Sequence, residues 1–406
     1  MNYDLLIVGG GAAGFFTAIN VAEKIPGIRI AILERGKEVL SKVRVSGGGR
    51  CNVTHAEFIP NELSKNYPRG EKELKGPFHT FMTGDTMDWF ERRGVALKIE
   101  EDGRIFPVTD ASETIINCFL TEAKRLGITI LKNHSVKNFN TNGAQWTVHT
   151  SQGDFETAKL MIATGSNPKM WERLTDLGHT TVAAVPSLFT FNIKDPKIKG
   201  LPGVATEALV QVKGSKLSSE GALLITHWGL SGPAILKLSA WGAIELHKRA
   251  YDFEILVNWL PQWSQNDVID TLHERKGQFS KQYIHTYAQF ELPKRLWQRL
   301  VITSGIQEDT RWADLSKVQC NTLSEQLTKS SFRVQGKSTF KEEFVTAGGV
   351  VLNEVNFKTF ESKKHANLYF AGEVLNIDAI TGGFNFQNAW TGGFIAAQAI
   401  ANKKDD

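Results

Sequence analysis

Three glycines and one glutamate near the N-terminus have the types and the spacing that bind a phosphorylated cofactor. Gly9, Gly11 and Gly14 fit the pattern GxGxxG directly after a short apolar run. The first glycine permits a tight turn, the second lets the backbone approach a pyrophosphate, and the third lets a helix pack closely on a sheet. Glu34 lies 20 residues beyond Gly14, where a carboxylate can accept hydrogen bonds from an adenosine ribose. The predicted cofactor contacts of this region are Gly9, Gly11, Ala12, Ala13, Gly14, Glu34 and Arg35.

A second glycine-rich segment contains three consecutive glycines at positions 47–49. Such a run allows the backbone to approach a flat, phosphorylated cofactor, although a flexible surface loop is the alternative. We expect Arg44 to pair with a phosphate group, and Arg50 and Asn52 to hydrogen-bond the cofactor. Cys51 has no cysteine nearby, so its thiol either packs against the cofactor or is a small core group. The predicted contacts here are Arg44, Ser46, Gly47, Gly48, Arg50, Cys51 and Asn52.

Two later segments indicate that the cofactor is FAD rather than NAD. A strand-like run at 155–162 leads into Ala-Thr-Gly, and another at 368–370 leads into Ala-Gly-Glu. Flavoproteins of the two-dinucleotide-binding type contact FAD at strand ends of both kinds. A long helix then begins near residue 384, and its positive N-terminal end beside the flavin would stabilise negative charge on the reduced ring. The residues predicted to contact FAD in the remainder of the chain are Val136, Thr164, Gly165, Gly372, Glu373, Gly383, Asn385 and Phe386.

His227 is the titratable residue that best suits proton transfer at a flavin. It lies in a turn-like segment rich in glycine and serine, residues 226–233. Reduction of a carbon–carbon double bond needs a hydride for one carbon and a proton donor for the other, and His227 is the candidate donor. The alternative is a histidine satisfied by backbone groups. Asp378 is either a carboxylate near the flavin or a turn residue.

The elements that must position these residues follow from the apolar patterns. Continuous apolar runs at 3–8 and 28–33 predict parallel strands buried on both faces, with a helix between them. Residues 109–125 predict an amphipathic helix, and the runs at 145–150 and 155–162 predict a hairpin. The sequence therefore predicts an α/β fold with a Rossmann-like unit.

The middle of the chain has a different pattern of apolar and polar residues, which indicates an inserted domain. Short strand-like segments begin near residue 191, and a polar, helical pattern follows to about residue 331. Between residues 191 and 340, Lys and Arg outnumber Asp and Glu by 19 to 14, a net charge of +5. We predict three stretches: the first part of an FAD-binding domain at 1–190, a β-rich and helical substrate domain at 191–344, and the closing part of the FAD-binding domain at 345–406.

Length and composition exclude several classes of protein. The chain has 406 residues, 41% hydrophobic and 22% charged, which is enough to bury sizeable cores. Three scattered cysteines exclude a disulfide framework. No apolar run approaches the ~18 residues of a membrane span, and no spacing of His, Cys and carboxylates indicates a metal site. We expect a cytoplasmic protein without a membrane partner or a metal; the oligomeric state stays open.

Several of these motifs together resemble a known family. The GxGxxG start, RVSGGGRCNVT (44–54), THWGLSGPAIL (226–236), TAGGV (346–350) and FAGEVLNIDAITGGFNFQNAWTGG (370–393) are similar to the BaiN/YhiN-like NAD(P)/FAD-dependent oxidoreductases. The resemblance covers essentially the whole length. It implies a split FAD domain of the two-dinucleotide-binding type, with a middle insert of β-barrel and helical parts. The family's chemistries include reduction of conjugated double bonds in steroid-like enones, oxidation of small amino ketones and reduction of a uracil ring in ribosomal RNA.

Two functions of different kinds follow as expectations. The first is an FAD-dependent oxidoreductase that reduces an activated double bond with NAD(P)H, the candidate substrate being a uracil ring in ribosomal RNA, which would yield dihydrouridine. The alternative is a flavin-dependent oxidase or reductase of a small molecule, an amino ketone or an enone. The sequence has no second GxGxxG unit for NAD(P)H, so that donor would have to approach the flavin directly. The substrate is therefore expected to be either RNA or a small molecule, and the basic insert is either an RNA-binding module or a solvated face.

Overall fold

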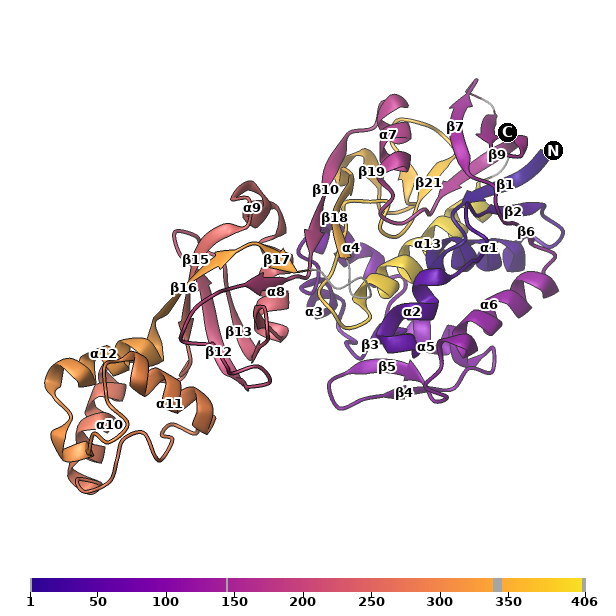
Figure 1. The fold of residues 1–406 in the computed structure, drawn as a ribbon. Helices are drawn as coiled ribbons and strands as arrows, with labels where there is room; N and C mark the ends of the chain where they lie inside the picture. The colour runs from indigo at the N-terminus through magenta and orange to yellow at the C-terminus, as the bar shows by residue number, and fades with distance from the viewer. Residues whose placement is uncertain (1, 144, 339–344, 404–406) are drawn as a thin grey trace. The chain divides into compact units, whose positions relative to one another are not determined.

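The computed structural model describes residues 2–143, 145–338 and 345–403. The chain divides into two compact units (Figure 1). Unit 1 is formed by Met1–Val185 together with Val345–Asp406, and unit 2 by Pro186–Phe344. Unit 1 is therefore built from two stretches of chain separated by the whole of unit 2.

A parallel sheet forms the centre of unit 1. Its strands pair in the order β21-β9-β1-β2-β6, and each of these pairs is parallel. The end of β1, the whole of β2 and the end of β9 are buried apolar runs, because both faces of the parallel sheet are covered there. The bounds of these strands are Asn2–Val8 (β1), Ile30–Leu33 (β2), Thr129–Leu131 (β6), Gly153–Ile162 (β9) and Leu368–Phe370 (β21).

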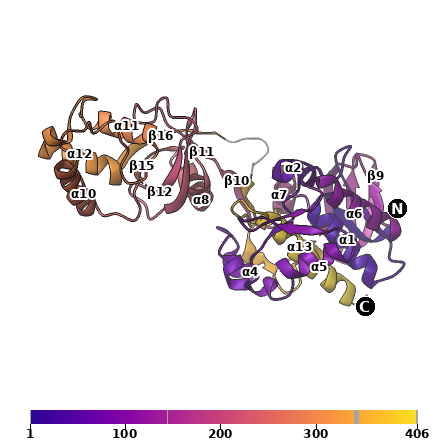
Figure 2. The ribbon, with the colours of Figure 1, turned by 90° about the horizontal axis from the view of Figure 1, so that it is seen from below.

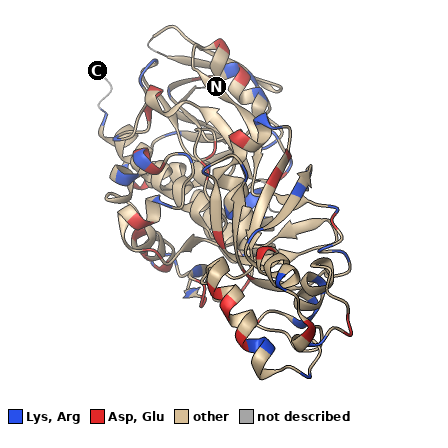
Figure 3. Cartoon of the chain, turned by 90° about the vertical axis from the view of Figure 1, so that its left-hand side faces the viewer, with Lys and Arg blue, Asp and Glu red and all other residues tan. Residues whose placement is uncertain are grey.

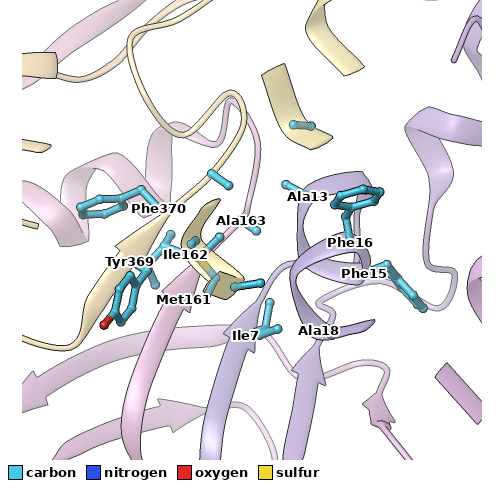
Figure 4. Packing of buried hydrophobic residues seen from close by; sticks show 14 of the residues in the cluster. Ile7, Ala13, Phe15, Phe16, Ala18, Met161, Ile162, Ala163, Tyr369 and Phe370 are labelled. Atoms are coloured by element: carbon cyan, nitrogen blue, oxygen red, sulfur yellow. The ribbon is translucent and has the colours of Figure 1, made fainter. Parts of the chain in front are cut away.

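Two helices from opposite ends of the chain pack side by side in unit 1. These are α1 (Ala12–Lys24) and α13 (Phe384–Asn402) (Figure 2). A Cβ atom on Gly393 of α13 would lie 3.0 Å from Thr17 Oγ1 and 3.2 Å from Ala13 O of α1, so the close approach of the two helices favours glycine at this position. Figure 4 shows Phe15 and Phe16 of α1 in the same core as Ile162 of β9. This close packing holds the first turn of α1 against the middle of α13.

The remaining elements of unit 1 flank this centre. The strands β7 and β8 form an antiparallel meander with β9, and β3, β5 and β4 form a small antiparallel sheet. The helices are α2 (Ser41–Gly49), α3 (Pro60–Ser64), α4 (Glu71–Phe78), α5 (Thr83–Glu91), α6 (Ser112–Arg125), α7 (Pro168–Asp176) and η2 (Leu352–Glu354). The strands are β3 (Thr54–His55), β4 (Leu97–Ile99), β5 (Arg104–Pro107), β7 (Val136–Thr141), β8 (Trp146–Thr150), β10 (Thr181–Ser187), β18 (Val345–Val350), β19 (Val355–Asn356) and β20 (Glu361–Ser362).

Unit 2 combines an antiparallel sheet with helices. Its described strands follow the order β16-β15-β12-β13-β14-β11-β17. They are β11 (Thr190–Asn192), β12 (Ala205–Val212), β13 (Ser218–Ile225), β14 (Gly229–Ser231), β15 (Asp252–Asn258), β16 (Ser330–Gln335) and β17 (Lys337–Ser338). The helices are α8 (Pro233–Trp241), α9 (Ala243–Lys248), α10 (Gln265–Gln278), α11 (Lys294–Thr303), η1 (Trp312–Asp314) and α12 (Lys317–Thr328). Alternation of buried and exposed residues along β12, β15 and β16 gives the unit a core of its own.

The structure confirms the α/β fold class with a Rossmann-type unit. The strand–helix–strand order predicted for the first 33 residues is present as β1, α1 and β2. None of the described helices combines the length and the apolar character that crossing a membrane requires. Among the described residues, no three His, Cys, Asp or Glu side chains gather in a way that could hold a metal ion.

A buried histidine joins the two stretches of unit 1 and makes its stability depend on pH. His179 Nδ1 lies 2.9 Å from Glu354 Oε2, and its Nε2 lies 3.1 Å from Ser362 Oγ. Burial lowers the pKa of His179, although Glu354 partly offsets this effect. Burial acts to raise the pKa of Glu354, but hydrogen bonds from Lys364, Thr180 and His179 outweigh it and lower that pKa to about 2.

Acidification is therefore expected to destabilise unit 1 in two steps. Below the ordinary histidine pKa of 6.5 the unfolded chain takes up a proton that folded His179 resists, so stability falls. Between pH 4.5 and about pH 2 the unfolded chain protonates Glu354 before the folded chain does, and stability falls again.

Urea unfolding at pH 7.5 and 5.5 measures the first step. The variant His179→Gln should flatten it, whereas replacement of the exposed His273 should not; an unchanged slope in His179→Gln would contradict the assignment.

Candidate cofactor site

The turn between β1 and α1 requires its glycines for different physical reasons. A Cβ atom on Gly9 would lie 2.3 Å from Ala163 O, and one on Gly14 would lie 2.1 Å from Gly9 O. Gly9 also has φ of +116°, which side chains disfavour. Around Gly11, in contrast, a Cβ atom would meet nothing within 4 Å. The first and third glycines are therefore needed by the fold, and the second leaves space over the N-terminal end of α1, where a helix favours anions.

Glu34 directly follows β2, and backbone N–H groups hold its side chain in place. Its Oε2 accepts a hydrogen bond from Gly10 N at 3.0 Å, and its Oε1 accepts one from Gly36 N at 2.7 Å. A carboxylate has about four lone-pair sites, so each oxygen can accept another hydrogen bond. The backbone of Glu34 accepts a hydrogen bond from His134 N at 2.8 Å, which brings the β6–β7 connection, and with it the start of β7 at Val136, to this end of the site. The neighbouring Arg35 is exposed.

The end of β9 lies next to the glycine-rich turn and to the end of β21. The position of Ala163 O against Gly9 places Thr164 and Gly165 directly beside the turn. A Cβ atom on Gly165 would lie 3.6 Å from Glu373 Oε2 and 3.7 Å from Lys42 Nζ, and Lys42 forms an ion pair with Glu373. The hydroxyl of Thr164 is buried and makes no hydrogen bond among the described residues. These groups gather donors, a cation and a carboxylate at the carboxyl ends of adjacent strands.

The second glycine run turns sharply out of α2. Ser46 has an extended ψ of 149°, and Gly47, Gly48 and Gly49 have φ of 57°, 67° and 86°. Three left-handed residues in succession are tolerated only by glycine at low cost. A Cβ atom on Gly48 or Gly49 would meet nothing within 4 Å. The run therefore exposes backbone that a large flat group can approach.

The same run leads into residues that hold the start of α13. A Cβ atom on Gly383 would lie 2.7 Å from Thr54 O. With the side-chain amide of Asn52 oriented to satisfy its neighbours, its oxygen accepts a hydrogen bond from Gly383 N at 3.0 Å and its nitrogen donates to Thr54 O at 2.9 Å. Trp390 Nε1 donates to Val53 O at 2.9 Å. The segment 52–54 and the N-terminal turns of α13 thus form one hydrogen-bonded assembly.

The turn that precedes α13 is held by an ion pair. Asp378 is fully buried and receives two hydrogen bonds from Arg69, so the structure makes Asp378 an anchor of this turn. Ala379 N donates to Asn385 Oδ1 at 3.1 Å, which closes the turn onto the helix. The ring of Phe386 stacks on Trp390 at 5.6 Å between centroids.

Gln387 is the hub of a fully buried hydrogen-bond network behind this turn. Its Oε1 accepts from Thr54 Oγ1 at 2.6 Å and from Thr86 Oγ1 at 2.9 Å, and its Nε2 donates to Thr391 Oγ1 at 3.1 Å. The variant Gln387→Leu leaves two buried hydroxyls without their acceptor and should lower the free energy of unfolding by about 2 to 4 kcal/mol. Urea unfolding measures this loss.

The matched control is Gln398→Leu, on the same helix, where the side-chain amide makes no hydrogen bond to another described residue. This control should change stability by less than about 1 kcal/mol. Equal losses in the two variants would mean that the network around Gln387 contributes nothing beyond helix packing.

Three of the residues expected to contact the cofactor have partners or surroundings within the protein, and their contact with the cofactor stays a prediction. Arg44 forms an ion pair with Glu113 of α6. Arg50 pairs with Glu100 at 2.6 Å, and its guanidinium lies 3.9 Å from the centroid of the Phe106 ring. Cys51 is fully buried, and this burial raises the pKa of its thiol to about 12. The thiol of Cys51 is therefore protonated at neutral pH and suits packing rather than redox chemistry.

The two histidines of interest lie in different units. His227 is exposed in the turn between β13 and β14 of unit 2, next to the exposed Trp228. His55 of unit 1 lies directly against the start of α13, with Nδ1 3.1 Å from Gly382 O and its ring 4.6 Å from that of Phe384. His55 is not among the residues that the sequence analysis predicts for the site. Its position at the end of the 44–54 motif is the signal that could have identified it.

The gathered groups fit FAD. Gly11 and Gly48 offer open backbone for phosphate groups and a flat ring, Glu34 retains acceptor capacity for ribose hydroxyls, and Thr164 has an unused buried hydroxyl. Phosphate binding at the N-terminal end of α1 follows from its free N–H groups. The site residues that the structure brings together around the strand ends are Gly9, Gly11, Ala12, Ala13, Gly14, Glu34, Thr164, Gly165, Gly372 and Glu373. A second group, Ser46, Gly47, Gly48, Asn52, Gly383, Asn385 and Phe386, surrounds the start of α13.

The chain is similar to known proteins over nearly its whole length. The family described as "HI0933-like protein Rossmann domain" matches residues 3–399. A curated relative, the ribosomal RNA dihydrouridine synthase of Escherichia coli K12, is 28% identical over 419 residues, 99% of each chain. The 3-dehydro-bile acid delta(4,6)-reductase of Clostridium scindens is 25% identical over 98% of each chain.

Solved structures share the fold at much lower identity. The 3-ketosteroid delta1-dehydrogenase of Sterolibacterium denitrificans superposes with a TM-score of 0.52 at 11% identity, covering 99% of this chain and 100% of that one. At this identity the likeness establishes the architecture alone, because one fold hosts many chemistries.

Proposed function

Because this chain belongs to the HI0933-like Rossmann family and is an FAD-dependent oxidoreductase, we propose that it reduces a uracil ring in ribosomal RNA to dihydrouridine, with NAD(P)H as the electron donor. The observation that carries the proposal is the likeness to the E. coli ribosomal RNA dihydrouridine synthase, which extends over 99% of both chains. The likeness therefore includes the insert as well as the cofactor unit. An RNA substrate of this kind implies a cytoplasmic enzyme.

The reaction adds a hydride and a proton across the carbon–carbon double bond of the uracil ring. Bound FAD would supply the hydride chemistry. In this proposal the turn at Gly9–Gly14 and the N-terminal end of α1 hold the pyrophosphate, Glu34 holds the ribose, and the 46–49 and 382–385 segments hold the flavin end. His227 is the candidate proton donor. The electron donor NAD(P)H would approach the flavin directly, because the sequence has no second GxGxxG unit to bind it.

Comparison of ribosomal RNA from cells with and without the gene tests the substrate. Mass spectrometry of the nucleosides should show the loss of one dihydrouridine in cells without the gene, restored by the wild-type gene. Anaerobic addition of NADH and of NADPH to the purified protein, followed at the oxidised flavin absorbance band, tests the electron donor. An unchanged nucleoside profile would reject the RNA substrate, and an unbleached flavin would reject both nicotinamide donors.

A small-molecule enone is the second candidate substrate. It is favoured by the bile acid delta(4,6)-reductase relative, which matches at 25% identity over 98% of each chain. Reduction of a steroid-like enone by the purified enzyme, together with an unchanged ribosomal RNA profile, would select this alternative.

A further inference from the structure

The positive charge of the insert is concentrated in two short segments. Residues 194–200 contain three lysines and Asp195, and residues 294–299 contain one lysine and two arginines. Together they carry six cations and one carboxylate, a net charge of +5. The insert between 191 and 340 has 19 cations and 14 carboxylates. The rest of the insert is therefore neutral, and these thirteen residues hold all of its excess charge.

The fold of unit 2 brings the two segments together. Arg295, at the start of α11, donates to Gly200 O at 2.5 Å, and Arg299 donates to Pro196 O at 3.1 Å. Helix α11 therefore lies against the 194–200 segment. These contacts join cations that are about one hundred positions apart in sequence into one surface, which we call the cationic surface.

The cationic surface continues to the turn that carries the exposed tryptophan. Ile193 N donates to Trp228 O at 2.9 Å, and Asn192 pairs with Gly229 between β11 and β14. Lys194 follows Ile193 directly and so lies beside this turn. Trp228 is 62% exposed, whereas tryptophan side chains are highly buried on average. One continuous surface thus combines cations with an exposed aromatic ring.

The surface differs from the charge pattern elsewhere in the chain. Figure 3 shows basic and acidic residues mixed along most of the ribbon. Many of these cations form ion pairs, for example Arg93 with Glu23 and Arg333 with Asp252. In contrast, Lys194, Lys199 and Lys294 are exposed, and their side chains make no hydrogen bond or ion pair among the described residues. Asp195 is the one carboxylate within the two segments, and Glu291 lies close before the second.

We propose that the cationic surface and Trp228 form the docking surface for the RNA substrate. The proposal rests on the function proposed above and deepens it by assigning where the RNA is held. The lysines and arginines contact the phosphate backbone, and each contact releases a counterion. The ring of Trp228 stacks on an unpaired base, which every base permits because each has a π-face. RNA with unpaired bases fits this surface better than a regular duplex does, because a stacking ring needs a single-stranded or splayed base.

A triple variant tests the electrostatic part. Lys194→Gln, Lys199→Gln and Lys294→Gln together remove three charges without removing any intramolecular bond of the described residues. The FAD-loaded full chain is titrated with deproteinised ribosomal RNA at several salt concentrations. The slope of the logarithm of the binding constant against the logarithm of salt concentration should fall by about 2 to 3. The matched control replaces the exposed Lys216, Lys248 and Lys281 with glutamine and should keep the slope of the wild type.

Two substitutions of Trp228 test the stacking part. Trp228→Ala should weaken binding of ribosomal RNA about tenfold, with the salt slope unchanged, because stacking carries no charge. Trp228→Phe retains a ring and should recover most of the affinity. If Trp228→Ala and Trp228→Phe weaken RNA binding equally, the ring of Trp228 does not stack on a base.

Other outcomes separate this proposal from the function on which it rests. If the triple variant and its control lose RNA affinity equally, or if the wild type binds no RNA at low salt, the assignment of the RNA docking surface is wrong. If polyglutamate or vesicles containing phosphatidylglycerol displace RNA completely at equal charge, the surface is a general anion binder and the assignment to RNA fails. The proposed function is tested independently by the dihydrouridine content of ribosomal RNA in cells, so a failure of one does not imply a failure of the other.

Discussion

Alanine in place of Gly11 should give a protein that folds normally but binds FAD about 10 to 100 times more weakly. The added methyl group meets no atom of the protein within 4 Å, so stability should be unchanged. It would, however, occupy the space over the N-terminal end of α1 through which a pyrophosphate reaches the free N–H groups. Loss of one hydrogen bond to a charged group costs about 1.5 to 3 kcal/mol, which corresponds to this loss of affinity.

The matched comparison is Gly9→Ala, two residues earlier. There the methyl group would lie 2.3 Å from Ala163 O at a backbone φ of +116°, so unit 1 itself should be destabilised. Thermal unfolding without added FAD and fluorescence titration with FAD separate the two effects. A Gly11→Ala protein that binds FAD as tightly as the wild type would show that the pyrophosphate lies elsewhere.

Removal of the Asp378 carboxylate should have the largest effect on stability. Asp378 is fully buried and paired with Arg69, whose side chain is 11% exposed. Asp378→Asn removes the negative charge that the Arg69 guanidinium faces in a poorly solvated position. Breaking a buried ion pair in this way lowers the free energy of unfolding by about 3 to 5 kcal/mol. Because the pair anchors the turn before α13, FAD affinity should fall with it. Urea unfolding and FAD titration measure the two losses.

A double variant distinguishes the pair from the packing around it. Arg69→Met combined with Asp378→Leu replaces both charges with apolar groups and should recover much of the stability, since apolar replacements of buried pairs are often close to neutral. A double variant as unstable as Asp378→Asn would mean that the loss comes from the shape of the turn rather than from the uncompensated charge.

The part of the site that the sequence predicts is the part made by local chain geometry. The strand, the glycine turn, α1 and Glu34 lie within 34 residues, and the pattern of apolar residues and glycines is sufficient to place them. The start of α13 is also local, because glycines at 382 and 383 precede an apolar helical pattern. The α/β fold class follows from the same signals and is confirmed.

The parts that the sequence does not predict depend on partners far away in the chain. Lys42 and Glu373 are 331 positions apart, Arg69 and Asp378 are 309 apart, and Thr54 and Gln387 are 333 apart. No periodicity relates such residues, so their contacts follow only from the packing of whole elements. The structure shows ion pairs of Arg44 with Glu113 and of Arg50 with Glu100, which the sequence pattern does not predict. The contact of both arginines with the cofactor stays a prediction. The role of His227 stays a prediction.

The split origin of unit 1 has a consequence for how the protein is made. Strand β21 pairs with β9 in the middle of the sheet, and α13 packs on α1, yet both emerge from the ribosome only after residues 186–344. At about 5 to 20 residues per second, synthesis of that stretch takes about 8 to 32 s. During this interval the nascent N-terminal half exposes an unpaired strand edge and an apolar helix face, both of which favour aggregation. Chaperone engagement of the growing chain should therefore be strongest in this interval and should end soon after the C-terminus is released.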